Sequence, residues 1–335
     1  ATQLSEMTFS VRRQADGLEY AGHPPWRQPH VLGRPRLLRL LGGIARFLRS
    51  AHADMDDLED AETLADWARR RGYGGDVLDL YLIPMCAALW SADPDDAAAI
   101  PARFVLRFFE QHALLGFRRH SWRTVTGGSR NYVAEIAARL GAHHVRTGTP
   151  VTRVARADGR VQITAAGRPP EQFDAVVVAT HPDQALALLA DPTPEERRLL
   201  GAFTYTASEA ILHTDAAILP RRERVRASWN YFLPAGAGQG PRVTYLLNRL
   251  QKLDEPLPYC VSLNCEEWIA PERILRRIPY EHPLFTTESV AAQAELAGLG
   301  HADNTAFCGA WQGWGFHEDG LVSGIAAARW LGATW

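Results

Sequence analysis

A continuous run of valine and alanine constrains the fold of this 335-residue chain more than any other feature. The run lies within residues 173–180, Phe-Asp-Ala-Val-Val-Val-Ala-Thr, and its centre has no polar position that would mark a solvent-facing side. Strands of parallel sheets have this composition, because helices cover both of their faces. A second short strand, expected at residues 305–308, is followed by a glycine-rich loop and a helix from 319 to about 331. The sequence therefore predicts a parallel sheet built from distant segments.

The rest of the chain divides into a helical part and a strand-rich part. Helices are expected at 37–48, 63–71, 76–90, 101–115 and 132–140. Thr63 is a candidate N-cap and Gly72 a candidate stop for the second of them. A hairpin is expected at 7–21, turning at Asp16-Gly17. Further strands are expected at 151–155, 161–164, 209–213, 227–233, 242–248 and 259–263.

These patterns predict an α/β fold of mixed α+β character. A discontinuous, nucleotide-binding Rossmann-like domain is interrupted by an inserted substrate domain, which combines an antiparallel sheet with helices. The expected ranges are a strand hairpin of the substrate domain at 1–25, a helical cap at 26–125, the nucleotide-binding domain at 126–200, the substrate-domain sheet at 201–298 and the closing nucleotide-binding segment at 299–335.

Composition excludes several classes of function. The formal net charge of −2 gives no global field for nucleic acid. The four cysteines lack a CxxC pair and the histidines lack an HExxH pattern, so neither a disulfide framework nor a metal site is expected. No signal peptide is recognised, and the apolar run 77–90 is shorter than the ~20 residues of a membrane span. We expect a soluble, cytoplasmic protein with a small-molecule substrate.

The C-terminal loop carries the clearest candidate site. Gly309, Gly313 and Gly315 would let the backbone approach a ligand closely. Asp319 can cap the following helix, whose first N–H groups suit an anion or a ligand carbonyl. An ordinary glycine-rich helix entry explains the same composition. Neither a P-loop nor a GxGxxG motif is present in the chain.

Several ordered segments resemble the FAD-dependent amine oxidase / phytoene desaturase superfamily, and most of all its bacterial branch of predicted NAD/FAD-binding oxidoreductases. The resemblance covers essentially the whole chain. It rests on residues 5–11, 127–132, 176–184, 212–215, 228–231, 244–251, 282–283 and 308–324.

This resemblance implies an FAD/NAD(P)-binding domain with FAD as the cofactor. Val151 would pair its backbone with the adenine, and Ala179 and Thr180 would line the approach to the adenosine and diphosphate. Other cofactor contacts are implied at the C-terminal loop and helix: Gly309 and Ala310 beside the ribityl chain, Asp319, Gly320 and Leu321 through helix N–H groups, and Trp311, Trp314 and Phe316 against the flavin face.

The chain departs from the family at its start. Such enzymes open with a strand–GxGxxG–helix unit of ~30 residues that holds the FAD diphosphate. That unit is absent from this sequence. Three explanations are expected: the chain is a fragment, another chain supplies the unit, or the protein is a degenerate relative of the family.

A second departure concerns lysine. Amine oxidases of the superfamily commonly place a lysine, through water, at the flavin N5, but this chain has one lysine, Lys252, in an expected loop. The sequence therefore favours hydride transfer to or from a lipid-like or isoprenoid carbon chain, by a desaturase, saturase or isomerase. A flavin amine oxidase and a non-catalytic or truncated FAD- or lipid-binding relative are the alternatives. No electron acceptor is identified.

His317 and Glu318 are the candidate catalytic acid and base, since their motif places them near the flavin edge; a histidine that merely orders the loop is the alternative. Candidate substrate-lining residues are Trp229, Asn230, Tyr245, Asn248 and Trp314. The alternative interpretation of the four residues on the expected strands is that the aromatic rings belong to the core and the amides form hydrogen bonds within the protein. His213 and Asp215 could form an orienting pair or a hydrogen bond at a strand end.

Residues 34–49 combine leucines with five arginines. A basic amphipathic helix can lie on an anionic membrane surface, which would bring a peripheral membrane contact. A plain lid helix is the alternative interpretation.

Overall fold

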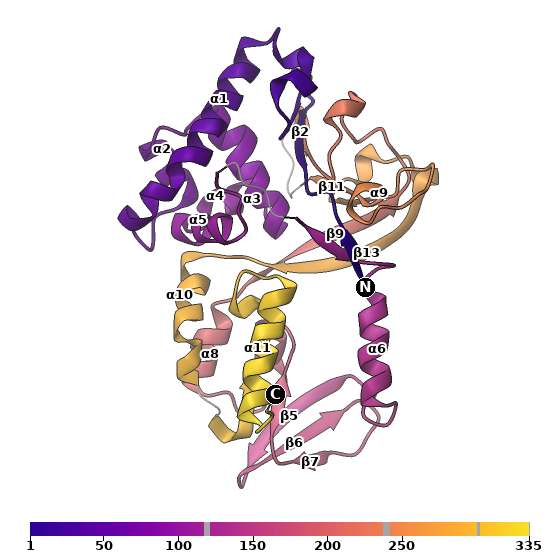
Figure 1. Cartoon of the computed structure of the whole chain (residues 1–335). Helices are drawn as coiled ribbons and strands as arrows, with labels where there is room; N and C mark the ends of the chain where they lie inside the picture. The colour runs from indigo at the N-terminus through magenta and orange to yellow at the C-terminus, as the bar shows by residue number, and fades with distance from the viewer. Residues whose placement is uncertain (117–120, 237–241, 300–301, 335) are drawn as a thin grey trace. The chain divides into compact units, whose positions relative to one another are not determined.

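The computed structural model describes residues 1–116, 121–236, 242–299 and 302–334. The chain forms two compact units, each assembled from two segments (Figure 1). Unit 1 contains residues 1–133 and 206–282, and unit 2 contains residues 134–205 and 283–335.

Unit 1 is built on a seven-stranded sheet in the order β13-β9-β12-β11-β10-β2-β3. Strand β10 runs parallel to β2, with Trp229 opposite Phe9, whereas the pairs β2–β3, β10–β11, β11–β12 and β12–β9 are antiparallel. The strands are β2 (Phe9–Arg13), β3 (Leu18–Ala21), β9 (Tyr205–His213), β10 (Trp229–Leu233), β11 (Val243–Leu246), β12 (Cys260–Leu263) and β13 (Ile274–Pro283).

The expected hairpin at Asp16-Gly17 joins β2 to β3, with Gly17 at φ +63°. Two short strands were not predicted, β1 (Thr2–Leu4) and β4 (Arg123–Val125), which pair antiparallel with each other. The two strands lie more than a hundred residues apart along the chain, so no local turn signal predicts their pairing.

Unit 1 also carries the expected helical layer. Its helices are α1 (Pro35–Ser50), α2 (Leu64–Arg70), a π-helical turn (Leu78–Leu82) that continues into α3 (Ile83–Trp90), α4 (Pro94–Ala99), α5 (Ala102–Gln111) and the short α9 (Leu247–Leu250). The Thr63 hydroxyl accepts the backbone N–H of Asp66 at 3.1 Å, so the predicted N-cap of α2 is confirmed. Helix α4 was not predicted, and α5 ends at Gln111 rather than at Leu115.

The apolar face of α1 is packed inside this helical layer. Leu37, Leu40, Ile44 and Phe47 are all buried. The amphipathic pattern of residues 34–49 therefore describes a helix that packs on its neighbours in unit 1, and these four side chains are not available to a membrane. No helix in the described parts of the chain has the length and apolar composition needed to cross a bilayer.

Unit 2 contains the predicted parallel sheet. Strand β8 (Val176–Val178) pairs in parallel with β14 (Thr305–Phe307), with Val176 opposite Thr305. An antiparallel three-stranded sheet consists of β5 (Val151–Ala157), β6 (Arg160–Ala165) and β7 (Glu171–Phe173). The remaining elements are α7 (Pro182–Leu188), α8 (Pro194–Gly201), α10 (Thr287–Glu295) and α11 (His317–Trp330), while α6 (Arg130–Leu140) crosses the boundary between the units.

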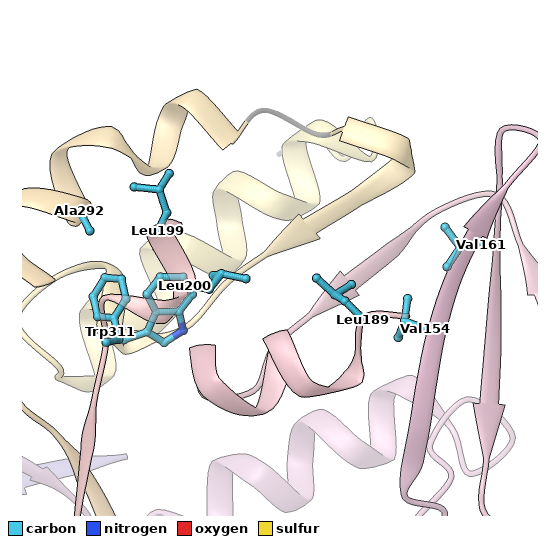
Figure 2. Packing of buried hydrophobic residues seen from close by; sticks show 8 residues of the cluster. Val154, Val161, Leu189, Leu199, Leu200, Ala292 and Trp311 are labelled. Atoms are coloured by element: carbon cyan, nitrogen blue, oxygen red, sulfur yellow. The ribbon is translucent and has the colours of Figure 1, made fainter. Parts of the chain in front are cut away.

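The core of unit 2 joins both of its chain segments. Val154, Val161, Leu189, Leu199, Leu200, Phe203, Ala292 and Trp311 form one buried cluster (Figure 2). A smaller cluster of Ala306, Cys308 and Ala327 packs β14 against α11. Burial of apolar surface in these two clusters holds the C-terminal loop and helix onto the β5–α8 segment.

Helix α6 departs from its sequence pattern. The period of apolar residues predicts a buried face, yet no residue of α6 is buried, and Tyr132, Val133, Ile136 and Leu140 are exposed. Leu321 and Val322 of α11 are exposed as well. Helices normally cover both faces of a parallel sheet with their apolar sides. The parallel sheet in the described part of unit 2 has two strands, and so offers little surface for such packing.

Candidate functional site

The carboxyl ends of β8 and β14 lie together at one edge of unit 2. The parallel register sets Phe307 opposite Val178, and the N–H of Cys308 donates to the Val178 carbonyl at 3.1 Å. Ala179 and Thr180 follow β8, and Gly309 follows β14. Ligands of open α/β sheets bind outside the carboxyl ends of the strands. The structure therefore brings three of the predicted cofactor-binding residues to the edge where such a ligand is expected.

The loop after β14 is anchored by two side chains that sequence reasoning missed. Ser323 of α11 accepts the Gly309 N–H at 2.9 Å and donates to the Gly320 carbonyl at 2.9 Å. Gln293 of α10 donates to the carbonyls of Trp311 and Gly313, at 2.8 and 2.6 Å. No local motif identifies either residue, because each contacts the loop through tertiary folding. The loop is consequently held on two sides before any ligand binds.

The three glycines of the loop serve packing inside the protein. A Cβ on Gly309 would overlap the Trp311 indole, and one on Gly313 would overlap the Asp319 carboxylate. Gly315, at φ +89°, lies against the Phe285 ring. They make room for the chain's own side chains. That these glycines also admit a ligand to the backbone stays a prediction.

Helix α11 begins at His317, two residues earlier than expected. The Asp319 carboxylate accepts the Phe316 N–H at 2.9 Å and so caps the helix, as the sequence predicted. Gly320 lies in the first turn and packs against Ala310. First-turn N–H groups have no partner within a helix and carry partial positive charge, which suits a phosphate or a carbonyl oxygen.

Trp311, which the resemblance places against the flavin face, packs in the core of unit 2. It is 3 % exposed, belongs to the buried cluster of unit 2, and packs edge-to-face on Phe203 with ring centroids 4.9 Å apart. The indole Nε1 is buried and has no hydrogen-bond partner among the described residues. A buried donor without an acceptor is costly. A bound group that reached the Trp311 Nε1 could supply the acceptor that this donor lacks.

The other aromatic and polar residues of the loop are nearer the surface of unit 2. Trp314 and Phe316 are half-buried, and His317 and Glu318 are exposed at the start of α11. Leu321 is exposed by 57 %. Val151 opens β5 and is 39 % exposed, and the Ala190 N–H ties this strand to the end of α7 by donating to the Val154 carbonyl at 2.9 Å.

In unit 1 the structure brings together two of the four predicted substrate-lining strand residues. Trp229 and Tyr245 are directly opposite each other on β10 and β11, with their rings edge-to-face at 5.2 Å. The Tyr245 hydroxyl donates to the Ala88 carbonyl of α3 at 3.1 Å. This face of the sheet therefore lies under the helical layer of unit 1.

Asn230 and Asn248 are placed elsewhere. Asn230 follows Trp229 on the same strand and so faces the opposite side of the sheet. Its amide is buried and bonds Ser10, Ala227 and the Thr244 carbonyl. Asn248 accepts the Tyr259 N–H and donates to two carbonyls of the 255–257 loop. Both asparagines hold the backbone of unit 1.

The face that carries Asn230 contains a buried polar row that the sequence analysis did not recognise. Ser10, Asn230, Thr244 and Ser262 are in register across four neighbouring strands. His213 extends the row, with its Nε2 at 2.8 Å from the Ser262 hydroxyl. The Asp215 N–H donates to Nδ1 of His213, so the candidate orienting pair is a hydrogen bond at a strand end.

A parallel sheet edge, an anchored loop and a helix N-terminus are together typical of nucleotide-binding α/β enzymes. The sequence identifies the family. A model of the flavin containing amine oxidoreductases matches residues 28–224, more than half of the chain, and the protein belongs to that family. It is an FAD-dependent oxidoreductase. A search of curated proteins gives no match to the chain.

Solved structures share the fold at low identity. A CLA-producing fatty acid isomerase from P. acnes is 14 % identical with a TM-score of 0.60, over 98 % of this chain and 80 % of that one. The cyclohexylamine oxidase of Brevibacterium oxydans IH-35A is 15 % identical, with a TM-score of 0.59 over 99 % and 83 % of the two chains. An oxidoreductase from Methanosarcina mazei is 13 % identical, with a TM-score of 0.62 over 98 % and 82 %.

The residues of unit 2 fit part of FAD. The first turn of α11 offers N–H groups to an anionic or carbonyl oxygen, and the buried Trp311 Nε1 lacks an acceptor. Ala179, Thr180, Gly309 and Ala310 would lie along such a ligand at the strand ends. The sequence contains no GxGxxG motif, so a grip on the diphosphate of that kind is not among these residues.

Proposed function

We propose that this flavin-dependent oxidoreductase transfers hydride to or from a lipid-like carbon chain, as a desaturase, saturase or isomerase. The position of Lys252, the chain's one lysine, is the observation that carries the proposal. Lys252 is exposed on the turn after α9, at φ +50°. A lysine that works through water at a flavin has to be held inside the protein, and this residue is at the surface of unit 1.

Similarity of fold does not choose between substrates. The solved structures that share this fold include a fatty acid isomerase and a cyclohexylamine oxidase at nearly equal similarity. The sheet face below the helical layer of unit 1 favours an apolar substrate. It carries Phe9, Val11, Trp229, Tyr231, Val243 and Tyr245, and none of the buried residues described on it is charged. A buried ammonium group would need a charged partner there.

In this proposal FAD supplies the hydride acceptor or donor. The chain's own residues bind and orient. The N-terminus of α11 holds a flavin or phosphate oxygen, and Ser323 and Gln293 keep the loop in place. His317 and Glu318 are the proposed proton-carrying groups, because an imidazole can donate and accept a proton near neutral pH and both side chains are accessible.

The first test is the absorption spectrum of the purified protein, before and after incubation with FAD and gel filtration. The expected result is a bound flavin spectrum with a stoichiometry near one. The second test is anaerobic bleaching of that spectrum by phospholipids or fatty acids, in parallel with hydrogen peroxide release from a panel of amines. We expect bleaching or reoxidation with acyl chains and no peroxide from amines.

The variant Lys252→Met gives the decisive comparison, with Lys252→Arg as its matched control. Both are expected to keep the wild-type rate, since the side chain is exposed. Peroxide release from an amine that Lys252→Met abolishes would establish amine oxidation and refute the proposal. A colourless protein that takes up no FAD would instead favour a non-catalytic relative.

A further inference from the structure

Three large apolar side chains are exposed within one short stretch of unit 1. Trp26 is 76 % exposed, Leu32 is 59 % exposed and Leu38 is 40 % exposed. They belong to the 3-10 turn Pro25–Arg27, to the end of the following turn, and to the first turns of α1. Single exposed leucines need no explanation. A tryptophan that leaves most of its surface in water, next to two exposed leucines, marks a candidate interaction site.

The backbone that carries Trp26 and Leu32 is fixed to the sheet. Gln28, 1 % exposed, donates to the carbonyls of Ala21 and His23 at 2.9 and 2.6 Å and accepts the Ala21 N–H at 3.1 Å. Val31 is buried, and its N–H donates to the Gln28 carbonyl at 3.0 Å. Gln28 thus pairs with edge strand β3 as a neighbouring strand would. The same contacts keep Trp26 and Leu32 turned to solvent.

Leu38 is exposed for a geometric reason. Its neighbours Leu37 and Leu40 face the core of the helical layer, and consecutive residues of a helix point about 100° apart. The exposed side of α1 continues with Arg39 and Gly42. The Trp26 surface is defined here as Trp26, Leu32 and Leu38 together with Arg27, Arg34 and Arg39.

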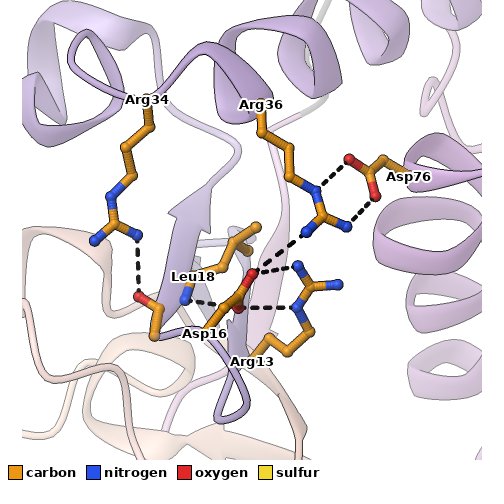
Figure 3. A network of polar contacts seen from close by, with 7 residues as sticks. Arg13, Asp16, Leu18, Arg34, Arg36 and Asp76 are labelled. Carbon is orange, nitrogen blue, oxygen red and sulfur yellow. Dashed lines mark hydrogen bonds and ion pairs between the residues drawn. The ribbon is translucent and has the colours of Figure 1, made fainter.

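The charge around this surface is positive. Arg27 and Arg39 are exposed and form no ion pair with any residue that the structure describes. Figure 3 shows the adjacent network, in which Arg34 donates to the Gly17 carbonyl and Arg36 binds Asp76 at 2.6 Å and Asp16 at 3.4 Å. Arg13 binds Asp16 as well. Arg13 and Arg36 therefore share two aspartates, and Arg34 together with the exposed Arg27 and Arg39 adds an excess of positive charge.

We propose that the Trp26 surface docks this protein onto an anionic phospholipid bilayer. Tryptophan prefers the boundary between headgroups and acyl chains, and arginines near a bilayer are attracted to anionic lipids. The two leucines add exposed apolar surface within the same stretch of the chain. The exposed tryptophan and the arginines without an ion pair together match a surface that is both amphiphilic and anionic. The inference does not depend on the substrate or on bound flavin.

The test is flotation of the whole chain with vesicles at low ionic strength. One set of vesicles contains equal parts of phosphatidylglycerol and phosphatidylcholine, and the other contains phosphatidylcholine alone. We expect the protein to float with the anionic vesicles and to remain at the bottom with the neutral ones. Added salt should release it, because exposed charges are screened.

Two variants test the surface itself. Trp26→Ala and the double variant Arg27→Glu/Arg39→Glu should each lower the partition coefficient by about tenfold. Their matched controls are Leu275→Ala, which removes another exposed apolar side chain of unit 1, and Arg224→Glu, which reverses another exposed arginine. Both controls should bind as wild type. Circular dichroism melting curves check that every variant is folded.

Three outcomes would overturn the proposal. The first is no flotation with anionic vesicles at low salt. The second is binding that Trp26→Ala and the double variant leave unchanged, which would place the contact elsewhere. The third is concentration-dependent self-association in sedimentation velocity that Trp26→Ala abolishes in the absence of lipid, since the occupant would then be a second copy.

Discussion

Among the described ion pairs, Arg156 and Glu196 stand out because both side chains are almost fully withdrawn from solvent. They are 2 % and 4 % exposed, with Nη1 and Oε1 2.6 Å apart. Glu196 also accepts the Thr193 N–H at 2.8 Å in the capping box of α8. Removing the Glu196 carboxylate leaves the buried Arg156 charge with the more distant Asp191, whose Oδ1 is 3.5 Å from Nε.

We predict that Glu196→Gln lowers the free energy of unfolding by about 3 kcal/mol, measured by urea denaturation. The matched control is Glu195→Gln in the same helix, which breaks an exposed pair with Arg198 and should change little. Equal effects of the two variants would mean that the buried pair contributes no more than a surface one.

His213 makes stability depend on pH. Burial lowers its pKa, although the nearby Asp215 carboxylate acts in the opposite direction. Its Nδ1 accepts the Asp215 N–H, so the neutral ring donates from Nε2 to Ser262. Because the folded pKa lies below the unfolded value of about 6.5, the folded state binds fewer protons, and stability is lost as pH falls below that value.

For one titrating group the slope cannot exceed about 1.4 kcal/mol per pH unit, and it is measured as the difference in unfolding free energy between about pH 7.5 and pH 5.5. A His213→Asn variant, which retains a polar side chain without a titrating group, should show a smaller difference. An identical slope in both proteins would exclude His213 as the source.

At the scale of the element, the loop and α11 behave as one folded piece. We predict that Gly309→Ala destabilises the protein by about 2–3 kcal/mol and lowers its flavin content, since the new methyl group would displace the Trp311 indole. Gly324→Ala in the same helix meets open space and should stabilise by up to about 1 kcal/mol. If Gly309→Ala retains its full flavin content, cofactor binding does not depend on the packing of this loop.

Elements with a local signature could be predicted from the sequence, whereas pairings between distant segments could not. The Asp16-Gly17 hairpin and the Thr63 cap depend on neighbouring residues alone. The β10–β2 pairing joins segments 220 residues apart, and nothing in either segment specifies its partner. Ser323 and Gln293 were missed for the same reason. The buried polar row was missed because its residues alternate with aromatic and aliphatic ones that belong to the other sheet face.

At the scale of the whole molecule, the discontinuous arrangement followed from two parallel strands expected far apart in the sequence, and the structure pairs those two strands. The interruption was expected at 201–298, while the compact units divide at residues 206 and 283. Helix α10 is therefore part of unit 2, where Gln293 and Ala292 contact the C-terminal loop and the core. Tertiary contacts of this kind leave no periodic signal in the sequence.

Hydrogen exchange with and without FAD tests whether unit 2 holds the cofactor. Ligand contacts slow exchange where they close local openings. We predict that FAD protects amides at 176–181 and 308–321, which include the strand ends, the loop and the first turn of α11. The amides of the polar row, such as Asn230 and Thr244, are already bonded within the sheet and should exchange slowly in both states. Protection confined to unit 1, or none in the 308–321 segment despite bound flavin, would show that the N-terminus of α11 does not hold the cofactor.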